Sequence, residues 1–294
     1  MTPNQTAQER MTATRVTMLA AIVAAARSDE RIVGLVEYGS GSEGRDDSWS
    51  DLDLALFIRD ADLASFSATW SAWAGQFGQL LLAYIGGIGH PWTIYATDPV
   101  PLRVDFAFHA ASTVERILDW PNAPRSAEAM VLHDATGGHL TTLATRLVGQ
   151  HLGPVDLRDT FNQVVGDIWY FTLRTWGKLQ RGDWWGAYTD AQHILLGNLL
   201  ALLRLECGAT ARWRSTSAAT WIERELSPER LAALKRCLPA AHQGELHDTI
   251  RAMAALAATA GLATAERQGW PWPHDLVERV QELLELPPGG ADLD

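Results

Sequence analysis

The spacing of apolar and polar positions divides the chain near residue 150. Before that point, short stretches alternate between apolar and polar residues, as strands with one buried face do. The pattern predicts helices at 7–28 and 60–76 and strands at 32–38, 51–58, 79–85, 91–96 and 102–108. A helix is expected from about residue 112, before a proline-rich break at 121–124. This is a mixed α/β pattern with short strands.

From Asp156 onward the apolar positions follow helical spacing almost throughout. Helices are predicted at 156–181, 184–207, 216–225, 228–236, 240–265 and 273–286, with Gly208, Pro228 and Pro239 at expected ends. The sequence therefore predicts an α+β protein with two domains. Residues 1–150 form a mixed twisted sheet with flanking helices, and residues 151–294 form an all-α helical bundle.

The strand at 51–58 carries two carboxylates on one face. Alternation places three leucines on one side and Asp51 and Asp53 on the other, roughly 6.5–7 Å apart along the strand. Burying two like charges without a partner is costly. A divalent cation removes that cost, and Mg²⁺ prefers carboxylate and phosphate oxygens. The alternative is an exposed acidic strand end beside a turn.

A glycine-rich turn precedes this strand. The apolar stretch at 32–38 stops at Gly39-Ser40, and glycines at 39, 41 and 44 allow positive φ angles and close backbone approach. Their N–H groups and the Ser40 hydroxyl suit phosphate oxygens. Alone, the turn is equally a plain surface connection. Followed by Ser50-Asp51-Leu52-Asp53, it indicates nucleotide chemistry.

Asp105 is the candidate for a third carboxylate. On the strand 102–108 it lies on the face opposite Phe106 and Phe108. Three carboxylates on neighbouring strands suit two metal ions about 3.5–4 Å apart, which clamp the attacking and leaving oxygens of an in-line displacement. Asp105 also suits a general base for a substrate hydroxyl. The alternative is an edge-strand acid paired with Arg103 or a lysine.

These residues resemble a known family. Gly39-Ser40, Gly44, Ser50-Asp51-Leu52-Asp53 and the later Asp105 are similar to the DNA polymerase β-type nucleotidyltransferase superfamily. Within it the chain looks closest to antibiotic nucleotidyltransferases, especially the lincosamide enzymes and their aminoglycoside-modifying relatives. Segments at 133–140, 177–184 and 274–279 resemble the later part of those enzymes.

The resemblance implies an enzyme that uses Mg²⁺, as two ions, with ATP or another NTP as co-substrate. Asp51, Asp53 and Asp105 would form the metal and catalytic set, with Asp105 as general base. Gly39, Ser40 and Ser50 would bind the nucleotide. Some relatives use Glu where this chain has Asp53 and Asp105, which changes the reach toward the substrate hydroxyl.

By the same resemblance, residues 1–150 are the catalytic domain, and residues 151–294 bind the acceptor or form a homodimer. The acceptor would be a small-molecule hydroxyl, on a lincosamide or an aminoglycoside, that receives an NMP, AMP in the case of ATP. Two alternatives remain. One is transfer to a protein side chain, as in toxin–antitoxin pairs, whose enzymes are usually shorter than this chain. The other is a nucleotide-binding protein without catalysis.

Composition and charge limit the classes of binding partner that the sequence predicts. The formal net charge is −11, and no cluster of Lys and Arg is present to bind a polyphosphate backbone, so nucleic acid is not expected. An acidic protein suits a cationic small molecule. No stretch approaches the ~20 apolar residues of a membrane span, and the start lacks a secretion signal. The two cysteines, Cys207 and Cys237, have no metal spacing, so the cytoplasm is the expected location.

The helical half offers candidates without a signature. Its aromatic residues suit either the wall of an acceptor pocket or the core: Trp169, Tyr170, Trp176, Trp184, Trp185 and Tyr188. Its acids suit either substrate amines or a solvated helix face: Asp183, Asp190 and Glu206. Lys178 or Arg174 is a candidate for contacting a phosphate.

Overall fold

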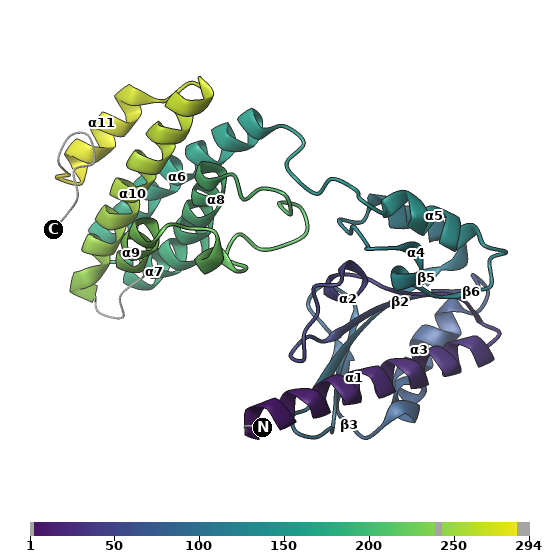
Figure 1. Cartoon of the computed structure of the whole chain (residues 1–294). Helices are drawn as coiled ribbons and strands as arrows, with labels where there is room; N and C mark the ends of the chain where they lie inside the picture. Colours follow the sequence, from purple (N-terminus) through teal and green to yellow (C-terminus); the bar gives the residue numbers. More distant parts are fainter. Residues whose placement is uncertain (1–2, 239–242, 287–294) are drawn as a thin grey trace. The chain divides into compact units, whose positions relative to one another are not determined.

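The computed structural model describes residues 3–238 and 243–286, and it confirms the predicted α+β class (Figure 1). The chain divides into two compact units, Met1–Leu152 and Gly153–Asp294. The first contains a six-stranded mixed sheet, and the described part of the second is helical. Among the described residues, no helix has the length and apolar character needed to cross a bilayer.

The sheet of the first unit joins strands from distant parts of the sequence. Its strands are β1 (Ile32–Glu37), β2 (Leu52–Ile58), β3 (Leu80–Ile85), β4 (Pro91–Tyr95), β5 (Leu102–Ala110) and β6 (Val131–Asp134). Their order is β3-β4-β5-β2-β1-β6. The central strands β2 and β5 pair in parallel, and the other neighbouring strands are antiparallel. Parallel pairing sets the start of β2 beside the start of β5, where the predicted acids lie.

Each face of the sheet has its own apolar core. On one face the leucines of β2 pack with α1 (Pro3–Ser28) and α3 (Leu63–Ala74). On the other, Ala55 and Phe57 pack with α5 and its neighbours. The helical elements that complete this unit are α2 (Ser40–Glu43), η1 (Gly75–Phe77), η2 (Ala111–Asp119), α4 (Ala127–Met130) and α5 (His139–Leu147). The period-two pattern of β2 therefore separates two cores, as its alternation predicts.

The second unit is built around its own core, which includes the fully buried Phe161 and Trp169. Side-chain oxygens of Asp156, Asp183 and Ser227 cap the starts of α6, α7 and α9, satisfying amides that have no partner within the helix. The elements are α6 (Leu157–Gln180), α7 (Trp184–Asp190), the π-helical turn η3 (Ala191–Leu195), α8 (Leu196–Cys207), η4 (Ile222–Arg224), α9 (Pro228–Arg236), η5 (Gln243–Glu245), α10 (Leu246–Gln268) and α11 (His274–Leu283).

Two expectations for the first unit need correction. The helix expected from residue 112 is the 3₁₀ segment η2. The sequence also did not predict β6, a four-residue strand whose residues are all half-buried. A strand this short shows no alternation between buried and exposed positions. Its pairing with β1 at the sheet edge is a tertiary contact.

The helix predicted at 216–225 is wrong. This segment forms turns and the short η4. The Arg204 guanidinium donates hydrogen bonds to the carbonyl oxygens of Ala218, at 2.7 Å, and of Thr220. Those carbonyls are therefore engaged by a distant side chain instead of by the next helical turn. The first residues of the helix predicted at 240–265, and the helix end predicted at Pro239, lie outside the described residues.

Candidate functional site

The three predicted carboxylates meet on one face of the sheet. Asp53 on β2 stands opposite Asp105 on β5 in the parallel register, and Asp51 precedes β2. Each offers one oxygen, and these three oxygens lie within 4.8 Å of one another. All three residues are half-buried. The expectation that Asp105 lies on a strand next to Asp51 and Asp53 is confirmed.

The cluster is electrostatically strained without a cation. Burial, and then the charges of Asp51, Asp105 and Glu37, raise the pKa of Asp53 to about 7. Burial and the charge of Asp51 also raise the pKa of Asp105. Two half-buried acids therefore resist ionisation because they face like charges in a poorly solvated site. An all-oxygen donor set with an excess of negative charge fits a hard divalent cation such as Mg²⁺.

Arg103 forms its ion pair with Asp51, and not with Asp105 as the alternative interpretation of Asp105 requires. Its Nη2 lies 2.8 Å from Oδ2 of Asp51, and its side chain is 61% exposed. Among the described residues, none forms an ion pair with Asp105. Asp105 is therefore not held as a simple edge-strand acid paired with Arg103.

Tyr38 is a neighbour of the acids that sequence reasoning did not single out. Its backbone N–H donates to the Asp53 carbonyl over 3.0 Å, which places it opposite Asp53 just beyond the end of β1. Burial first, and then the charges of Asp53, Asp105 and Asp51, raise the pKa of its phenol well above the ordinary value. The phenol therefore stays protonated beside the carboxylates.

The glycine turn runs directly against the acids. Gly39 has φ 65°, and a Cβ at this position would lie 3.0 Å from Oδ2 of Asp53. Glycine is therefore required both for the backbone conformation and for the close approach. Ser40 begins the one-turn helix α2, so its amide has no partner four residues earlier in the helix.

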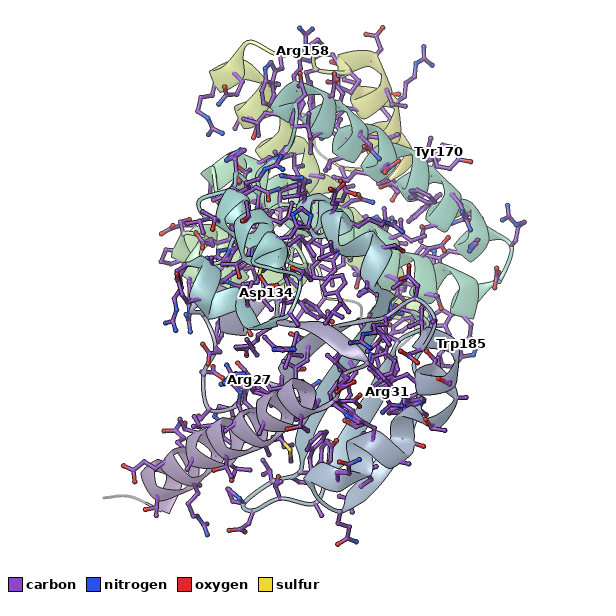
Figure 2. All side chains as sticks on the ribbon, turned by 90° about the vertical axis from the view of Figure 1, so that its right-hand side faces the viewer. Arg27, Arg31, Asp134, Arg158, Tyr170 and Trp185 are labelled. Atoms are coloured by element: carbon purple, nitrogen blue, oxygen red, sulfur yellow. The ribbon has the colours of Figure 1, made fainter. Side chains whose placement is uncertain are left out.

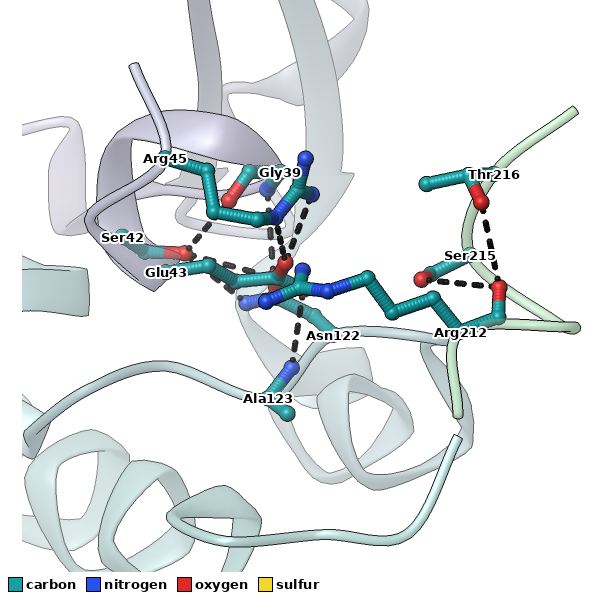
Figure 3. A network of polar contacts seen from close by, with 9 residues as sticks. All are labelled: Gly39, Ser42, Glu43, Arg45, Asn122, Ala123, Arg212, Ser215 and Thr216. Carbon is teal, nitrogen blue, oxygen red and sulfur yellow. Dashed lines mark hydrogen bonds and ion pairs between the residues drawn. The ribbon is translucent and has the colours of Figure 1, made fainter. Parts of the chain in front are cut away.

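Asn122 holds this turn in place from 83 residues away (Figure 3). Its Oδ1 accepts hydrogen bonds from the Gly39 N–H at 3.1 Å and the Ser42 hydroxyl at 3.2 Å. Asn122 is only 3% exposed. The sequence marked this region only as a proline-rich break, because the contact between two such distant segments has no local signature.

A second contact ties the same two segments together. The Glu43 carboxylate accepts from the Ala123 N–H at 3.1 Å and from Arg45 Nε at 2.7 Å (Figure 3). The Arg125 N–H donates to the Ser42 carbonyl at 2.9 Å. The loop from 122 to 125 therefore braces α2 through both backbone and side chains.

Ser50 contacts its own turn. Its hydroxyl accepts from the Asp47 N–H at 3.0 Å and lies 3.2 Å from Oδ1 of the same residue. These bonds shape the entry to β2. A cavity of about 160 Å³ opens here, with Ser50, Asp51, Trp49 and Arg103 in its wall. A role for Ser50 in nucleotide binding stays a prediction.

The aromatic candidates of the second unit divide between core and surface. Trp169 is fully buried, whereas Tyr170 and Trp185 are 66% and 71% exposed (Figure 2). The others are partly buried against the core: Trp176, Trp184 and Tyr188.

The charged candidates of the second unit have partners within it. Asp183 caps α7, and Glu206 pairs with Arg230. Asp190 is buried, and its Oδ2 lies 2.7 Å from Lys178 Nζ and 3.3 Å from Arg174 Nε. These contacts are ion pairs without hydrogen-bond geometry. They give Lys178 and Arg174 an acidic partner within the unit. A phosphate contact by either residue stays a prediction.

Comparisons with known proteins give matches among solved structures. No family model matches the chain, and no curated protein matches it. Eleven chains of solved structures match. One of them is an aminoglycoside 6-adenyltransferase from Bacillus subtilis, at 15% identity and a TM-score of 0.43, covering 92% of this chain and 96% of that one.

Proposed function

We propose that this protein is a Mg²⁺-dependent nucleotidyltransferase that moves an NMP, AMP from ATP, onto a hydroxyl of a small molecule. The observation that carries the proposal is the meeting of Asp51, Asp53 and Asp105 on one sheet face, directly against the Gly39 turn. A charged oxygen cluster beside a glycine turn is the arrangement that transfer of a nucleoside phosphate requires.

Each group of residues at the site has its own role in the proposed reaction. Asp51, Asp53 and Asp105 would hold Mg²⁺, which when bound stabilises negative charge on the phosphate oxygens. The turn at Gly39 and Ser40 receives the triphosphate, and Asn122 keeps that turn in its conformation. Asp105 accepts the proton of the acceptor hydroxyl. The acceptor oxygen forms a bond to the α-phosphorus, the bond from that phosphorus to the bridging oxygen breaks, and pyrophosphate leaves.

The acceptor class is the second part of the proposal. The likeness of the active-site motif to antibiotic nucleotidyltransferases suggests an aminoglycoside or a lincosamide, and both carry amines. The formal charge of −11 suits a cationic acceptor and opposes a nucleic acid. The same likeness suggests a cytoplasmic homodimer.

Pyrophosphate release from Mg²⁺–ATP tests the proposal, measured across a panel of aminoglycosides and lincosamides. We expect release with one drug class, and a loss of at least a thousandfold in Asp53→Asn and Asp105→Asn. Glu30→Gln is the matched control, because this exposed acid lies outside the cluster and should keep the wild-type rate.

Two results would count against the proposal. Near-normal turnover in Asp53→Asn would contradict the metal scheme. Transfer of labelled AMP to a protein in a lysate, with no release on the drug panel, would favour a protein acceptor instead.

A further inference from the structure

Strand register places aromatic side chains beside the acids in a row across the sheet. Asp105 on β5 stands opposite Trp92 on β4, and Trp92 stands opposite Tyr84 on β3. On the other side of Asp105 the row continues through Asp53 to Tyr38. Directly opposed residues of neighbouring strands share a face. The acids therefore lie between the Gly39 turn, which follows Tyr38, and an aromatic pair.

A second row of opposed residues lies next to the first on the same face of the sheet, and its residues on β3 and β4 are apolar. Leu82 on β3 stands opposite Ile94 on β4, and Ile94 stands opposite Arg103. We call Leu82, Tyr84, Trp92 and Ile94 the aromatic patch. Leu82 and Tyr84 are 45% and 43% exposed, and Trp92 and Ile94 are half-buried. An apolar surface beside a charged site indicates a binding surface.

On β4 the alternate residues are buried, so this strand is exposed on one face only. Thr93 and Tyr95 are 1% and 0% exposed and belong to the opposite face. The Thr93 hydroxyl donates to the Val104 carbonyl over 2.6 Å, and the Tyr95 hydroxyl donates to the Ala74 carbonyl over 2.9 Å. These bonds hold β4 in place on the face opposite the aromatic patch. They therefore fix the position of the strand that carries Trp92 and Ile94.

Gly86 leaves room for the indole ring of Trp92 in the aromatic patch. The Trp92 ring lies so close over Gly86 that a Cβ there would collide with it. Tyr84 meets the Trp92 ring edge-on, with centroids 5.8 Å apart. The two rings therefore hold each other in fixed orientations, which reduces the entropy lost when a ligand packs on them.

The geometry of in-line displacement indicates which substrate approaches the side of Trp92 and Tyr84. The attacking oxygen must approach phosphorus from the side opposite the departing pyrophosphate. If pyrophosphate departs on the Gly39 side, the acceptor arrives from beyond Asp105. That is where Trp92 and Tyr84 stand. Asp105, the proposed base, then lies between the phosphorus and the patch.

We propose that the aromatic patch is the acceptor subsite and that it takes an amino sugar, with the C–H face of the ring packed on Trp92 and Tyr84. A sugar ring combines an apolar face with hydroxyls at its edge, so packing on the patch directs a hydroxyl toward Asp105. An ammonium group attached to the sugar ring is also attracted to the face of an aromatic ring, which strengthens binding. This assignment rests on the nucleotidyltransferase function proposed above.

Ligand-observed NMR titration of the full chain tests the subsite without requiring turnover. The probes are glucosamine and a glycosylated 2-deoxystreptamine, with Mg²⁺ and α,β-methylene-ATP present. We expect Tyr84→Ala and Trp92→Ala each to weaken binding of the amino sugars by roughly tenfold. Affinity for the ATP analogue should stay unchanged. Trp92→Phe keeps a ring and should lose less, and Val16→Ala, an exposed site on α1, serves as control.

Several outcomes would overturn the subsite. Wild-type protein that binds neither amino sugar would do so, as would variants that bind both as well as wild type. A loss of affinity for the ATP analogue in the two alanine variants would assign the patch to the nucleobase. Absence of Mg²⁺-dependent binding of the ATP analogue to wild type would instead refute the nucleotidyltransferase function. That result is distinguishable because amino-sugar binding is measured separately.

Discussion

At the scale of single residues, the site is defined by charges brought together at a cost. Asp53 and Asp105 have raised pKa values because burial removes water and the neighbouring acids repel them. A folded protein tolerates such a cluster when a bound cation compensates it. The cost should therefore be visible in stability as well as in activity.

Replacing Asp53 with Asn should stabilise the metal-free protein. The change removes one like charge while keeping the shape of the side chain, and we expect a gain of about 1–3 kcal/mol at pH 8. Adding Mg²⁺ should raise the Tm of the wild type and leave the variant nearly unchanged. Thermal unfolding with and without Mg²⁺ measures both effects. Equal stabilisation of the two proteins by Mg²⁺ would place the cation elsewhere.

Asn122→Ala should impair the nucleotide side of the reaction. The change removes the acceptor of the Gly39 N–H and one of the two acceptors of the Ser42 hydroxyl, which also faces the Gly39 carbonyl. The expected cost is about 1–3 kcal/mol for a buried group. A loosened turn should raise KM for the NTP by roughly tenfold or more, with little change in KM for the acceptor. Asn162→Ala, an exposed asparagine on α6, is the matched control. A uniform loss of folded protein would point to a structural role alone.

At the scale of elements, short connections carry much of the order around the sheet. Asp134 ends β6, and its carboxylate accepts from the N–H and hydroxyl groups of Thr136 and Thr141, at 2.6–2.9 Å. One side chain thus joins the end of β6 to the first turn of α5. Burial raises its pKa, but these hydrogen bonds outweigh burial and lower the pKa to about 2.

This shift predicts a pH-dependent contribution to stability. Because the folded pKa is below the ordinary 3.8, the folded state favours the carboxylate. Its contribution is full above pH 4 and disappears as pH falls through about 2. Asp134→Asn should cost about 1 kcal/mol at pH 7, given solvent screening. Urea unfolding from pH 7 to pH 2.5 should show the gap between wild type and variant narrowing. A constant gap would contradict this origin.

At the scale of the whole molecule, the two units have separate interiors. The cores on the two faces of the sheet belong to the first unit, and the core around Phe161 and Trp169 belongs to the second. The segment between α5 and α6 is exposed at both ends, with Val148 at 43% and Val155 at 96%, whereas Leu152 within it is buried. Each unit therefore has the apolar interior that independent folding requires.

Limited proteolysis should separate the units. We expect elastase, which cuts after small apolar residues, to cleave first after Val148 or Val155 because these are the exposed valines of the segment and cleavage needs exposed, locally open chain. Two fragments of similar size should remain, each with cooperative thermal unfolding by circular dichroism. First cleavage within α6 or α10, or fragments without cooperative unfolding, would show that the units depend on each other.

The sequence by itself determined the local features of the site. Period-two alternation put Asp51 and Asp53 on one face of β2, because side-chain direction in a strand depends only on position. The turn at Gly39 also followed from the local sequence, because glycine allows positive φ angles and close backbone approach. The α+β class followed from the change of period near residue 150.

Tertiary structure decided which distant residues meet. Parallel pairing of β2 with β5 set Asp105 opposite Asp53, and the pairing of β4 with β5 set Trp92 beside them. The contact of Asn122 with Gly39 and the capture of two carbonyls by Arg204 have no local pattern. They arise because folding satisfies buried polar groups with whichever partners the packed chain brings near. Local periodicity specifies a face, and only the packed sheet specifies the neighbour.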